Sequence, residues 1–204
     1  MSTLELRHRH VGPWGMNTYA LVCPVTKASV LIDPGADPET LLAMLAGTTP
    51  VAILLTHTHQ DHIGALAEMQ QALKVPLLAH RNATGRQITA DRWLDTGDQV
   101  TVGENTLRVV YAPGHIDDQI CFILENDHRI IVGDTIFAGG PGRTASSEAF
   151  QTTLATLRTV VLPWSDDAVC YPGHGPSFRL GDIRAAVEGF VQRDHGPFFG
   201  DAEW

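Results

Sequence analysis

Three histidines and an aspartate stand within six positions, directly after a run of apolar residues. The apolar run, Val51 to Leu55, has the length and composition of a buried strand, and the polar cluster at 57–62 precedes a segment with helical periodicity. In an α/β sheet, the loops after the carboxyl ends of strands hold side chains where a ligand can reach them. This feature therefore requires a fold in which the strand ends at an accessible sheet edge.

The spacing inside the cluster indicates a metal site. His57 and His59 are two positions apart, so on extended backbone their side chains point the same way and can share one ion. Asp61 and His62 follow after the chain turns, and they can reach a second position nearby. Imidazole and carboxylate together suit zinc, iron, manganese or nickel, and not calcium or magnesium alone.

Three further ionisable residues follow apolar runs in the same way. His115 follows the string APG, Asp134 follows IIVG and His174 follows YPG, so that each comes directly after a glycine. Glycine permits the tight backbone that turns the next side chain inward, although a simple turn is the alternative interpretation of each string alone. Together with the first cluster they supply five histidines and two aspartates at predicted strand ends, which is enough for two metal ions.

The order of predicted elements indicates an α/β fold. In the first half we expect strands at 29–33, 51–55 and 75–79 and helices at 38–46 and 63–74, with Asp37 as N-cap and Pro38 first in its helix. The second half predicts hairpins of 99–102 with 106–111 and of 120–124 with 129–132, then a helix at 147–161, a strand at 168–171 and a helix at 182–192. No linker or repeat interrupts this order, so residues 1–204 are expected to form a single domain.

Charge and cysteine content narrow the class of partner. The net charge is −9 and lysine occurs only at Lys27 and Lys74, so no basic patch favours nucleic acid or an anionic membrane surface. The three cysteines form no close pair, which favours a reducing compartment, and no apolar stretch is long enough to span a bilayer. We therefore expect a cytoplasmic protein that binds a small molecule.

The motifs together resemble the metallo-β-lactamase-fold superfamily, and within it the hydroxyacylglutathione hydrolase (glyoxalase II) branch. The matching strings are LIDPGAD (31–37), THTHQDHIGAL (56–66), APGH (112–115), VGDTIFAGGPGRT (132–144) and YPGHGP (171–176). They run in the family's order and cover the chain from about residue 17 to 180.

The resemblance implies an αββα four-layer sandwich, in which two mixed sheets pack face to face and helices flank them. It also implies two metal sites that share one bridging residue. The implied ligands are His57, His59 and His115 for the first ion, Asp61, His62 and His174 for the second, and Asp134 with a hydroxide as the bridge. Asp33 either orients one of these histidines or only forms an Asp–Pro turn.

This arrangement implies an enzyme, a binuclear metallohydrolase whose bridging hydroxide attacks a carbonyl carbon. Two metals lower the pKa of bound water and stabilise the oxyanion, with Asp61 and Asp134 as the catalytic carboxylates that hold them. The first interpretation is a thioesterase that acts on a small acyl-thiol. Zinc is the first expectation for both metals, with iron or manganese as alternatives.

The same residues are compatible with three other functional hypotheses. A persulfide dioxygenase of this fold uses one iron, which here would be held by His57 or His59, with His115 and Asp134. A lactonase or another metallohydrolase of the same fold would use the complete set. A non-catalytic metal-binding domain would instead close the site with protein ligands.

The chain departs from glyoxalase II around the substrate. Asp117 and Asp118 replace the small polar residues that often follow the third metal-binding histidine, and the expected C-terminal basic region is replaced by one helix and an aromatic tail at 197–199. Glutathione as the leaving thiol is therefore open. Arg143 is the basic residue expected near a substrate anion, with a surface salt bridge as its alternative role. The aromatic tail favours an interface such as a homodimer's, and the oligomeric state stays open.

Overall fold

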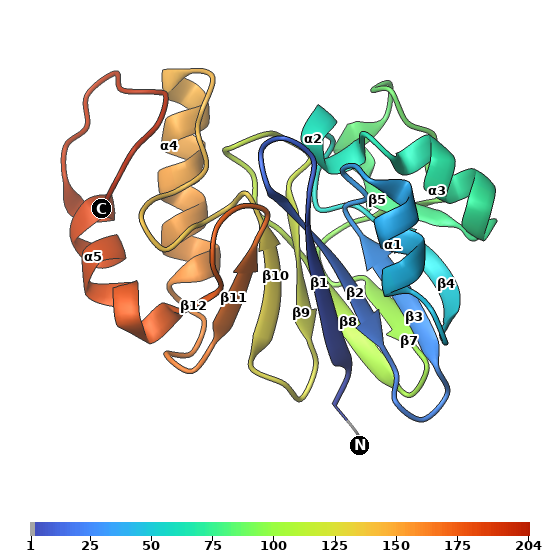
Figure 1. Ribbon diagram of the computed structural model, residues 1–204. Helices are drawn as coiled ribbons and strands as arrows, with labels where there is room; N and C mark the ends of the chain where they lie inside the picture. The colour runs from blue at the N-terminus through green and yellow to red at the C-terminus, as the bar shows by residue number, and fades with distance from the viewer. Residues whose placement is uncertain (1–2) are drawn as a thin grey trace.

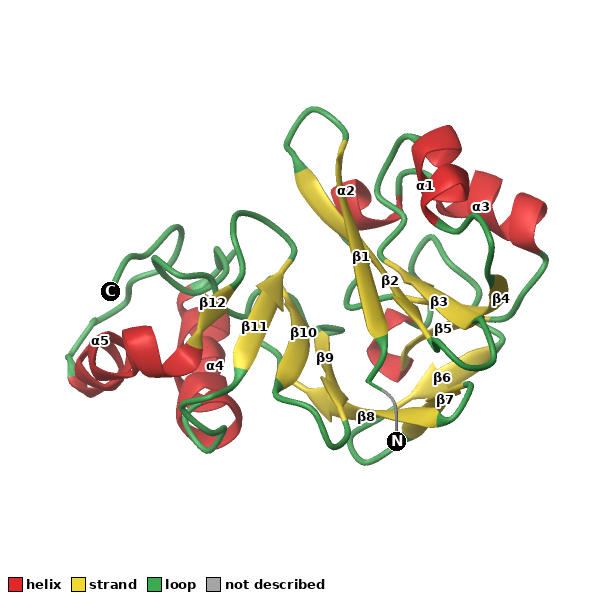
Figure 2. Cartoon of the chain, turned by 60° about the horizontal axis from the view of Figure 1, so that its bottom comes forward, coloured by secondary structure: helices red, strands yellow, loops and turns green. Residues whose placement is uncertain are grey.

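Two six-stranded sheets face each other at the centre of the molecule (Figures 1 and 2). The structure, a computed structural model, describes residues 3–204. The first sheet contains the strands of the N-terminal half, and the second contains those of the C-terminal half. Each sheet therefore belongs to one half of the chain, and a functional site at their common edge draws residues from both halves.

The first sheet runs in the order β1-β2-β3-β4-β5-β6. β1 pairs with β2 and β2 with β3 in antiparallel register, and the remaining pairs are parallel. Its strands are β1 (Glu5–Val11), β2 (Met16–Val22), β3 (Ala28–Ile32), β4 (Thr49–Leu54), β5 (Leu77–His80) and β6 (Arg92–Leu94). The parallel arrangement brings the carboxyl ends of β3, β4 and β5 to one edge of this sheet.

The second sheet runs in the order β12-β11-β10-β9-β8-β7. All its pairs are antiparallel except β10 with β11, which is parallel. Its strands are β7 (Gln99–Val102), β8 (Asn105–Tyr111), β9 (Ile120–Leu124), β10 (Arg129–Gly133), β11 (Val169–Pro172) and β12 (Phe178–Arg179). The parallel pair again brings two strand carboxyl ends together, those that precede Asp134 and His174.

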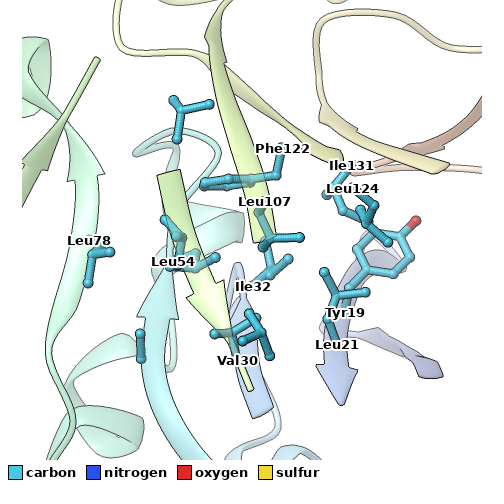
Figure 3. Close-up of a cluster of buried hydrophobic side chains, with 14 of the residues drawn as sticks. Tyr19, Leu21, Val30, Ile32, Leu54, Leu78, Leu107, Phe122, Leu124 and Ile131 are labelled. Carbon is cyan, nitrogen blue, oxygen red and sulfur yellow. The ribbon is translucent and has the colours of Figure 1, made fainter. Parts of the chain in front are cut away.

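The space between the sheets is filled by alternate residues of the central strands. Val30 and Ile32 of β3 face Phe122 and Leu124 of β9 in this core, with Tyr19 beside them (Figure 3). The intervening residues point the other way, so that Leu31 packs under the helices of the first sheet. Because both faces of these strands are buried, their sequences read as continuous apolar runs.

Helices cover the two outer faces (Figure 2). On the first sheet lie α1 (Pro38–Met44), α2 (Gln60–Ile63) and α3 (Leu66–Leu73), and a short 3-10 turn (Arg81–Ala83) follows β5. On the second lie α4 (Ser147–Thr156), its π-helical extension (Leu157–Val161) and α5 (Leu180–Gln192). Each layer of helices has its own apolar cluster beneath it. The predicted αββα sandwich is confirmed.

Several predicted boundaries are wrong. The single helix expected at 63–74 is interrupted after Ile63, because the backbone N–H of Ala65 donates to the carbonyl of Pro34 at 2.9 Å. Gly64 sits so close to the same loop that a Cβ there would lie 2.4 Å from the Gly35 carbonyl oxygen. The helix expected at 147–161 changes to π geometry at Leu157, and the strands β2, β6 and β12 were not predicted. Asp37 does occupy the N-cap position of α1, yet its carboxylate accepts from the backbone of Gly12 instead of capping the helix.

The three cysteines are free thiols, and each is buried. Within residues 3–204, every helix is too short or too polar to cross a membrane.

Candidate metal centre

The seven residues predicted as ligands meet where the two sheets present their strand ends. The cluster at 57–62 follows β4, His115 follows β8, Asp134 follows β10 and His174 follows β11. They therefore come from both sheets. The structure brings all seven into one region in two groups of three, with Asp134 between the groups.

The first group consists of His57, His59 and His115. Nδ1 of His59 lies 3.1 Å from Nε2 of His57 and 2.8 Å from Nε2 of His115. Around a tetrahedral ion with metal–nitrogen bonds of about 2.0–2.1 Å, ligand nitrogens lie about 3.3 Å apart, close to these separations. The three rings thus converge on a volume of the size that one ion occupies.

Hydrogen bonds behind two of these rings leave their inner nitrogens without a hydrogen. Nδ1 of His115 lies 2.7 Å from the Arg143 carbonyl oxygen, which can only accept, so this nitrogen carries the hydrogen. The Thr56 hydroxyl donates to Asp33 at 2.6 Å and accepts from Nδ1 of His57 at 3.1 Å. Both Nε2 atoms therefore point lone pairs at His59, and a metal ion satisfies three converging nitrogens where a single proton cannot.

The second group consists of Asp61, His62 and His174. Oδ2 of Asp61 lies 3.0 Å from Nε2 of His174 and 4.0 Å from Nε2 of His62. Nε2 of His62 is buried without a hydrogen-bond partner in the described part of the chain. Such an orphaned nitrogen, aimed at a carboxylate and another imidazole, fits a second metal ion.

Asp134 lies between the two groups. Its Oδ1 is 3.4 Å from Nε2 of His62, and its Oδ2 is 3.5 Å from Nε2 of His115 and 3.7 Å from Nε2 of His174. Oδ1 is buried and, among residues 3–204, has no hydrogen-bond partner. One carboxylate thus faces both groups, as a bridge between two ions must.

Asp33 supports the site from behind. Oδ2 of Asp33 accepts from Nδ1 of His62 at 2.9 Å, and Oδ1 accepts from the backbone N–H of Thr56 at 2.7 Å. The residue is 1% exposed and has a left-handed φ of 54°, which an aspartate tolerates. Of its two expected roles, the structure therefore shows the contact with a histidine ring.

Burial and charge keep the first group neutral. Burial, with help from the neighbouring imidazoles, holds the pKa of His57 well below its ordinary value and lowers that of His59 to about 4. Burial likewise lowers the pKa of His115. Neutral imidazole is the form that binds a metal, so this group needs to lose no proton.

The second group behaves differently because carboxylates surround it. Burial lowers the pKa of His62, but the contacts with Asp134 and Asp33 outweigh burial and raise it to about 10. The hydrogen bond from His174 lowers the pKa of Asp61 to about 2. The second group therefore favours a positive charge, which either a protonated His62 or a bound cation can supply.

Gly173 makes room for this arrangement. A Cβ at this position would lie 2.2 Å from Oδ1 of Asp134 and 2.5 Å from Cε1 of His62. The glycine before His174 is therefore needed for the space beside the bridging carboxylate, in addition to the turn that its sequence predicted.

Two clefts open on either side of the centre. The tail-side cleft, of about 830 Å³, is lined by His115, Asp134 and His174, by the loop 137–143 and by residues 201–204. The helix-side cleft, of about 570 Å³, is lined by His59, His115, residues 111–117 and the first turns of α4. Residues of the two groups therefore border both clefts.

The structure also places the residues expected to contact substrate. Arg143 lines the tail-side cleft, and its Nε lies 3.4 Å from Oδ2 of Asp201. Asp117 lines the helix-side cleft, whereas Asp118 is buried. Among the described residues, the other five histidines, His8, His10, His80, His128 and His195, belong to no group of three possible metal ligands.

Sequence reasoning missed several supporting residues. Oε1 of Gln119 accepts from the backbone N–H of Asp134 at 3.3 Å, and no local pattern marks that contact. The tail residues Asp201, Glu203 and Trp204 line the tail-side cleft, although only the aromatic character of the preceding segment was noticed. These contacts join distant parts of the chain, so spacing gives no signal for them.

Comparison with known proteins agrees with this geometry. The model of the metallo-beta-lactamase superfamily matches residues 11–174. The chain is 28% identical over 216 residues to the probable metallo-hydrolase YqgX of Bacillus subtilis (strain 168), covering 96% of this chain and 97% of that protein. It is 35% identical over 159 residues to the hydroxyacylglutathione hydrolase of Rhodopseudomonas palustris (strain BisA53), covering 76% of this chain and 61% of that enzyme. The chain thus spans about three fifths of the length of that relative.

Solved structures show the same fold. The crystal structure of BLEG-1 B3 metallo-beta-lactamase superposes with a TM-score of 0.81 at 28% identity, covering 93% of this chain and all (100%) of that one. The structure of TTHA1623 in a di-iron-bound form superposes with a TM-score of 0.73 at 29% identity, covering 87% of this chain and 96% of that one.

Proposed function

This chain belongs to the metallo-beta-lactamase superfamily, and we propose that within it the chain is a binuclear metallohydrolase that cleaves thioesters of small acyl-thiols. The observation that carries the proposal is the position of Asp134, whose two oxygens face one group of ligands each. The likeness to a hydroxyacylglutathione hydrolase and to a protein solved with two irons supports it.

Two divalent ions held here would supply Lewis acidity and lower the pKa of a bound water. We propose His57, His59 and His115 as ligands of the first ion, Asp61, His62 and His174 as ligands of the second, and Asp134 as the bridge. Zinc is the metal we propose first, with iron or manganese as alternatives. The residues around them hold each ring in one orientation, as the contacts of Asp33 and the Arg143 carbonyl illustrate.

In the proposed reaction, the water oxygen forms a bond to the acyl carbon, the carbon–sulfur bond breaks, and the protons of water end on the carboxylic acid and the thiol. No cysteine serves as nucleophile in this proposal, because Cys23, Cys121 and Cys170 are all buried. The clefts on either side of the centre have room for the acyl group and for the thiol part.

We propose that this site binds a small molecule. The net charge of −9 disfavours polyanionic partners such as nucleic acid, and the two clefts have volumes of about 830 and 570 Å³. The reduced, buried cysteines support our proposal of a cytoplasmic location.

Metal content and turnover together test the proposal. Protein purified without added metal is expected to contain about two transition-metal ions per chain by elemental mass spectrometry, and to hydrolyse S-lactoylglutathione or a simpler thioester. Asp134→Ala and His57→Ala are expected to lose metal and nearly all turnover while circular dichroism shows an intact fold. Unchanged turnover in both variants would contradict the proposal.

Metal content and turnover also distinguish the alternative functions. One iron per chain, with oxygen uptake in the presence of glutathione persulfide, would support a dioxygenase instead. Two metals without thioesterase activity, but with turnover of lactones or a chromogenic cephalosporin, would keep the hydrolase and change its substrate.

A further inference from the structure

The tail after α5 is built into the wall of the tail-side cleft. The backbone N–H of Thr144 donates to the carbonyl of Gly200 at 3.1 Å, and the N–H of Gly200 returns a bond of the same length. Nε1 of Trp204 donates to the Ala138 carbonyl at 2.9 Å, while its ring packs edge-on against Phe190 at 5.1 Å between centroids. Residues 200–204 are therefore fixed along the loop that leads to the metal ligands.

This docking leaves two carboxylates at the cleft. Ala202 and Trp204 are half-buried, whereas the alternate residues Asp201 and Glu203 are exposed and line the cleft. The tail passes so close to the loop 137–143 that only a glycine fits at position 140: a Cβ on Gly140 would lie 2.1 Å from the Ala202 carbonyl oxygen. Asp201 and Glu203 thus stand at the cleft as exposed acidic groups, beside the half-buried Ala202 and Trp204 that also line it.

Arg143 is not free to bind an incoming anion. It is the only arginine or lysine among the residues lining the tail-side cleft, and Asp201 faces its guanidinium with Nε and Oδ2 3.4 Å apart. A negatively charged substrate would have to replace a carboxylate that is already present. Arg143 together with Asp201 and Glu203 leaves the wall with one negative charge in excess.

The helix-side cleft has the same character. Asp117 and Glu148 line it, and no lysine or arginine does. The N-terminus of α4 carries a partial positive charge there, but Glu148 lies in its first turn and the Ser146 hydroxyl already accepts from the N–H of Ala149. Asp117 is paired with Arg86, which does not line the cleft. An anion would thus meet no unpaired side-chain cation on either side of the centre.

Aromatic side chains complete the tail-side wall. Phe137 and Trp204 both line it, and such rings favour a cationic or an uncharged group over an anion. We propose that the tail residues Asp201 and Glu203 determine specificity at this site, and that the thioesters cleaved here carry a cationic or uncharged thiol part in preference to an anionic one such as glutathione. This inference rests on the proposed thioesterase function.

Three thioesters that share an acetyl group test it. Acetylthiocholine has a permanently cationic thiol part, S-acetyl-N-acetylcysteamine a neutral one, and S-acetylglutathione an anionic one. We compare kcat/KM for each in the metal-loaded wild type and in the double variant Asp201→Asn, Glu203→Gln. Because intrinsic leaving-group ability is the same for both proteins, the change in the glutathione-to-thiocholine ratio reports the tail alone.

We expect that ratio to rise about five- to tenfold in the double variant at low ionic strength, and less in 0.5 M salt, where exposed charges are screened. The matched control is the double variant Asp194→Asn, Glu188→Gln. It also removes one aspartate and one glutamate charge, but from exposed positions that do not line the cleft. The control is expected to leave the ratio within twofold. Circular dichroism and metal content confirm that both variants are folded and loaded.

The outcomes separate this inference from the function on which it rests. An unchanged ratio in the double variant, or an equal rise in the control, would overturn the role of the tail while thioesterase activity stands. Preference of the wild type for S-acetylglutathione, after each rate is divided by the spontaneous hydrolysis rate of the same ester, would overturn the inferred substrate class. Hydrolysis of none of the three would contradict the proposed function and this inference with it.

Discussion

Oδ2 of Asp33 lies 2.9 Å from Nδ1 of His62, and this contact decides which nitrogen of the ring faces the centre. With Nδ1 bonded to the carboxylate, Nε2 is left pointing at Asp134. A carboxylate behind a ligand histidine fixes the ring and makes it a stronger donor to a metal. Asp33 is thus a positioning residue for the second group of ligands.

Replacing this carboxylate by an amide should weaken one metal site. For Asp33→Asn we expect the affinity for the second ion to fall about 10- to 100-fold, because the amide cannot accept from both Thr56 and His62 with the charge that a carboxylate brings. Competitive chelation with a chromophoric chelator measures the loss. Asp37→Asn is the matched control, because Asp37 shares the left-handed φ and the same loop but accepts only from Gly12. Equal affinities in the two variants would contradict the role given to Asp33.

The space that Gly173 leaves beside the Asp134 carboxylate should be needed for binding two metal ions. Gly173 has no left-handed φ, so Gly173→Ala suits the backbone, but its Cβ would overlap Oδ1 of Asp134. We expect the metal content to fall from about two ions per chain to about one, because the bridge must move. Elemental analysis after dialysis measures this.

A helix glycine provides the comparison. A Cβ at Gly189 in α5 meets no atom within 4 Å, so Gly189→Ala should keep the metal content and gain about 0.5–1 kcal/mol of stability. Two ions per chain in Gly173→Ala would show that the centre tolerates the methyl group.

Metal binding should depend on pH through the second group of ligands. In the metal-free protein the carboxylates of Asp134 and Asp33 outweigh burial and raise the pKa of His62 to about 10, so the ring is protonated at pH 7. The hydrogen bond with Asp61 also raises the pKa of His174, the other ring of this group. A metal needs neutral rings, so the second ion must displace at least the proton of His62, and its apparent affinity should rise at least about tenfold per pH unit below pH 10. The first group should release none, because the pKa of His59 is about 4.

Calorimetry in buffers of different ionisation enthalpy counts these protons. Loading the two ions in sequence should give near zero protons for one step and at least one for the other, because both His62 and His174 have raised pKa values. Equal proton release in both steps would contradict the assigned protonation of His62. The raised pKa of His62 also stabilises the fold of the metal-free protein. This stabilisation is complete below about pH 6.5, the ordinary pKa of histidine, and is lost as pH rises through 10.

The sequence predicted which seven residues come together, because each of them follows local rules. Each ligand loop comes after an apolar run and shows Gly, Pro or His in a recognisable string, and the runs are buried on both faces as their composition indicates. The placement of Asp134 opposite His174 then follows from the parallel pairing of β10 and β11. Local patterns and strand pairing together brought all seven residues into one region.

What the sequence could not predict depends on contacts between distant segments. The break between α2 and α3 exists because Ala65 bonds to Pro34, thirty-one positions away, and helical periodicity alone predicts no break there. β2 was missed because polar Asn17 and Thr18 interrupt its apolar run. Both are buried: the Asn17 amide donates to the carbonyl of Pro172 in the second sheet, and the Thr18 hydroxyl donates to the carbonyl of Asp33. The tail likewise reaches the cleft through contacts between distant segments: Gly200 bonds to Thr144, and Trp204 bonds to the loop at 138–139.

Asp118 is a buried acid that its neighbours Thr58 and Arg86 compensate only in part, and replacing it by an amide should stabilise the fold. It is 1% exposed, and neither carboxylate oxygen has a hydrogen-bond partner in the described residues; Nε of Arg86 is 3.9 Å away. Burial raises the pKa of Asp118 above its ordinary value. Its ionisation therefore costs stability, from about pH 4 upward, and the full cost is present above the raised pKa.

For Asp118→Asn we therefore expect a gain of about 1–2 kcal/mol at pH 7, or about 2–8 °C in Tm, because a buried charge is replaced by a neutral amide. The gain should shrink toward pH 4, where the wild-type carboxyl is also neutral. Asp117→Asn is the matched control: this neighbour is exposed and paired with Arg86, so its loss should leave stability unchanged or slightly lower. Thermal unfolding of the three proteins at pH 4 and pH 7 tests the prediction, and a lower Tm for Asp118→Asn at pH 7 would show that this carboxylate has a stabilising partner.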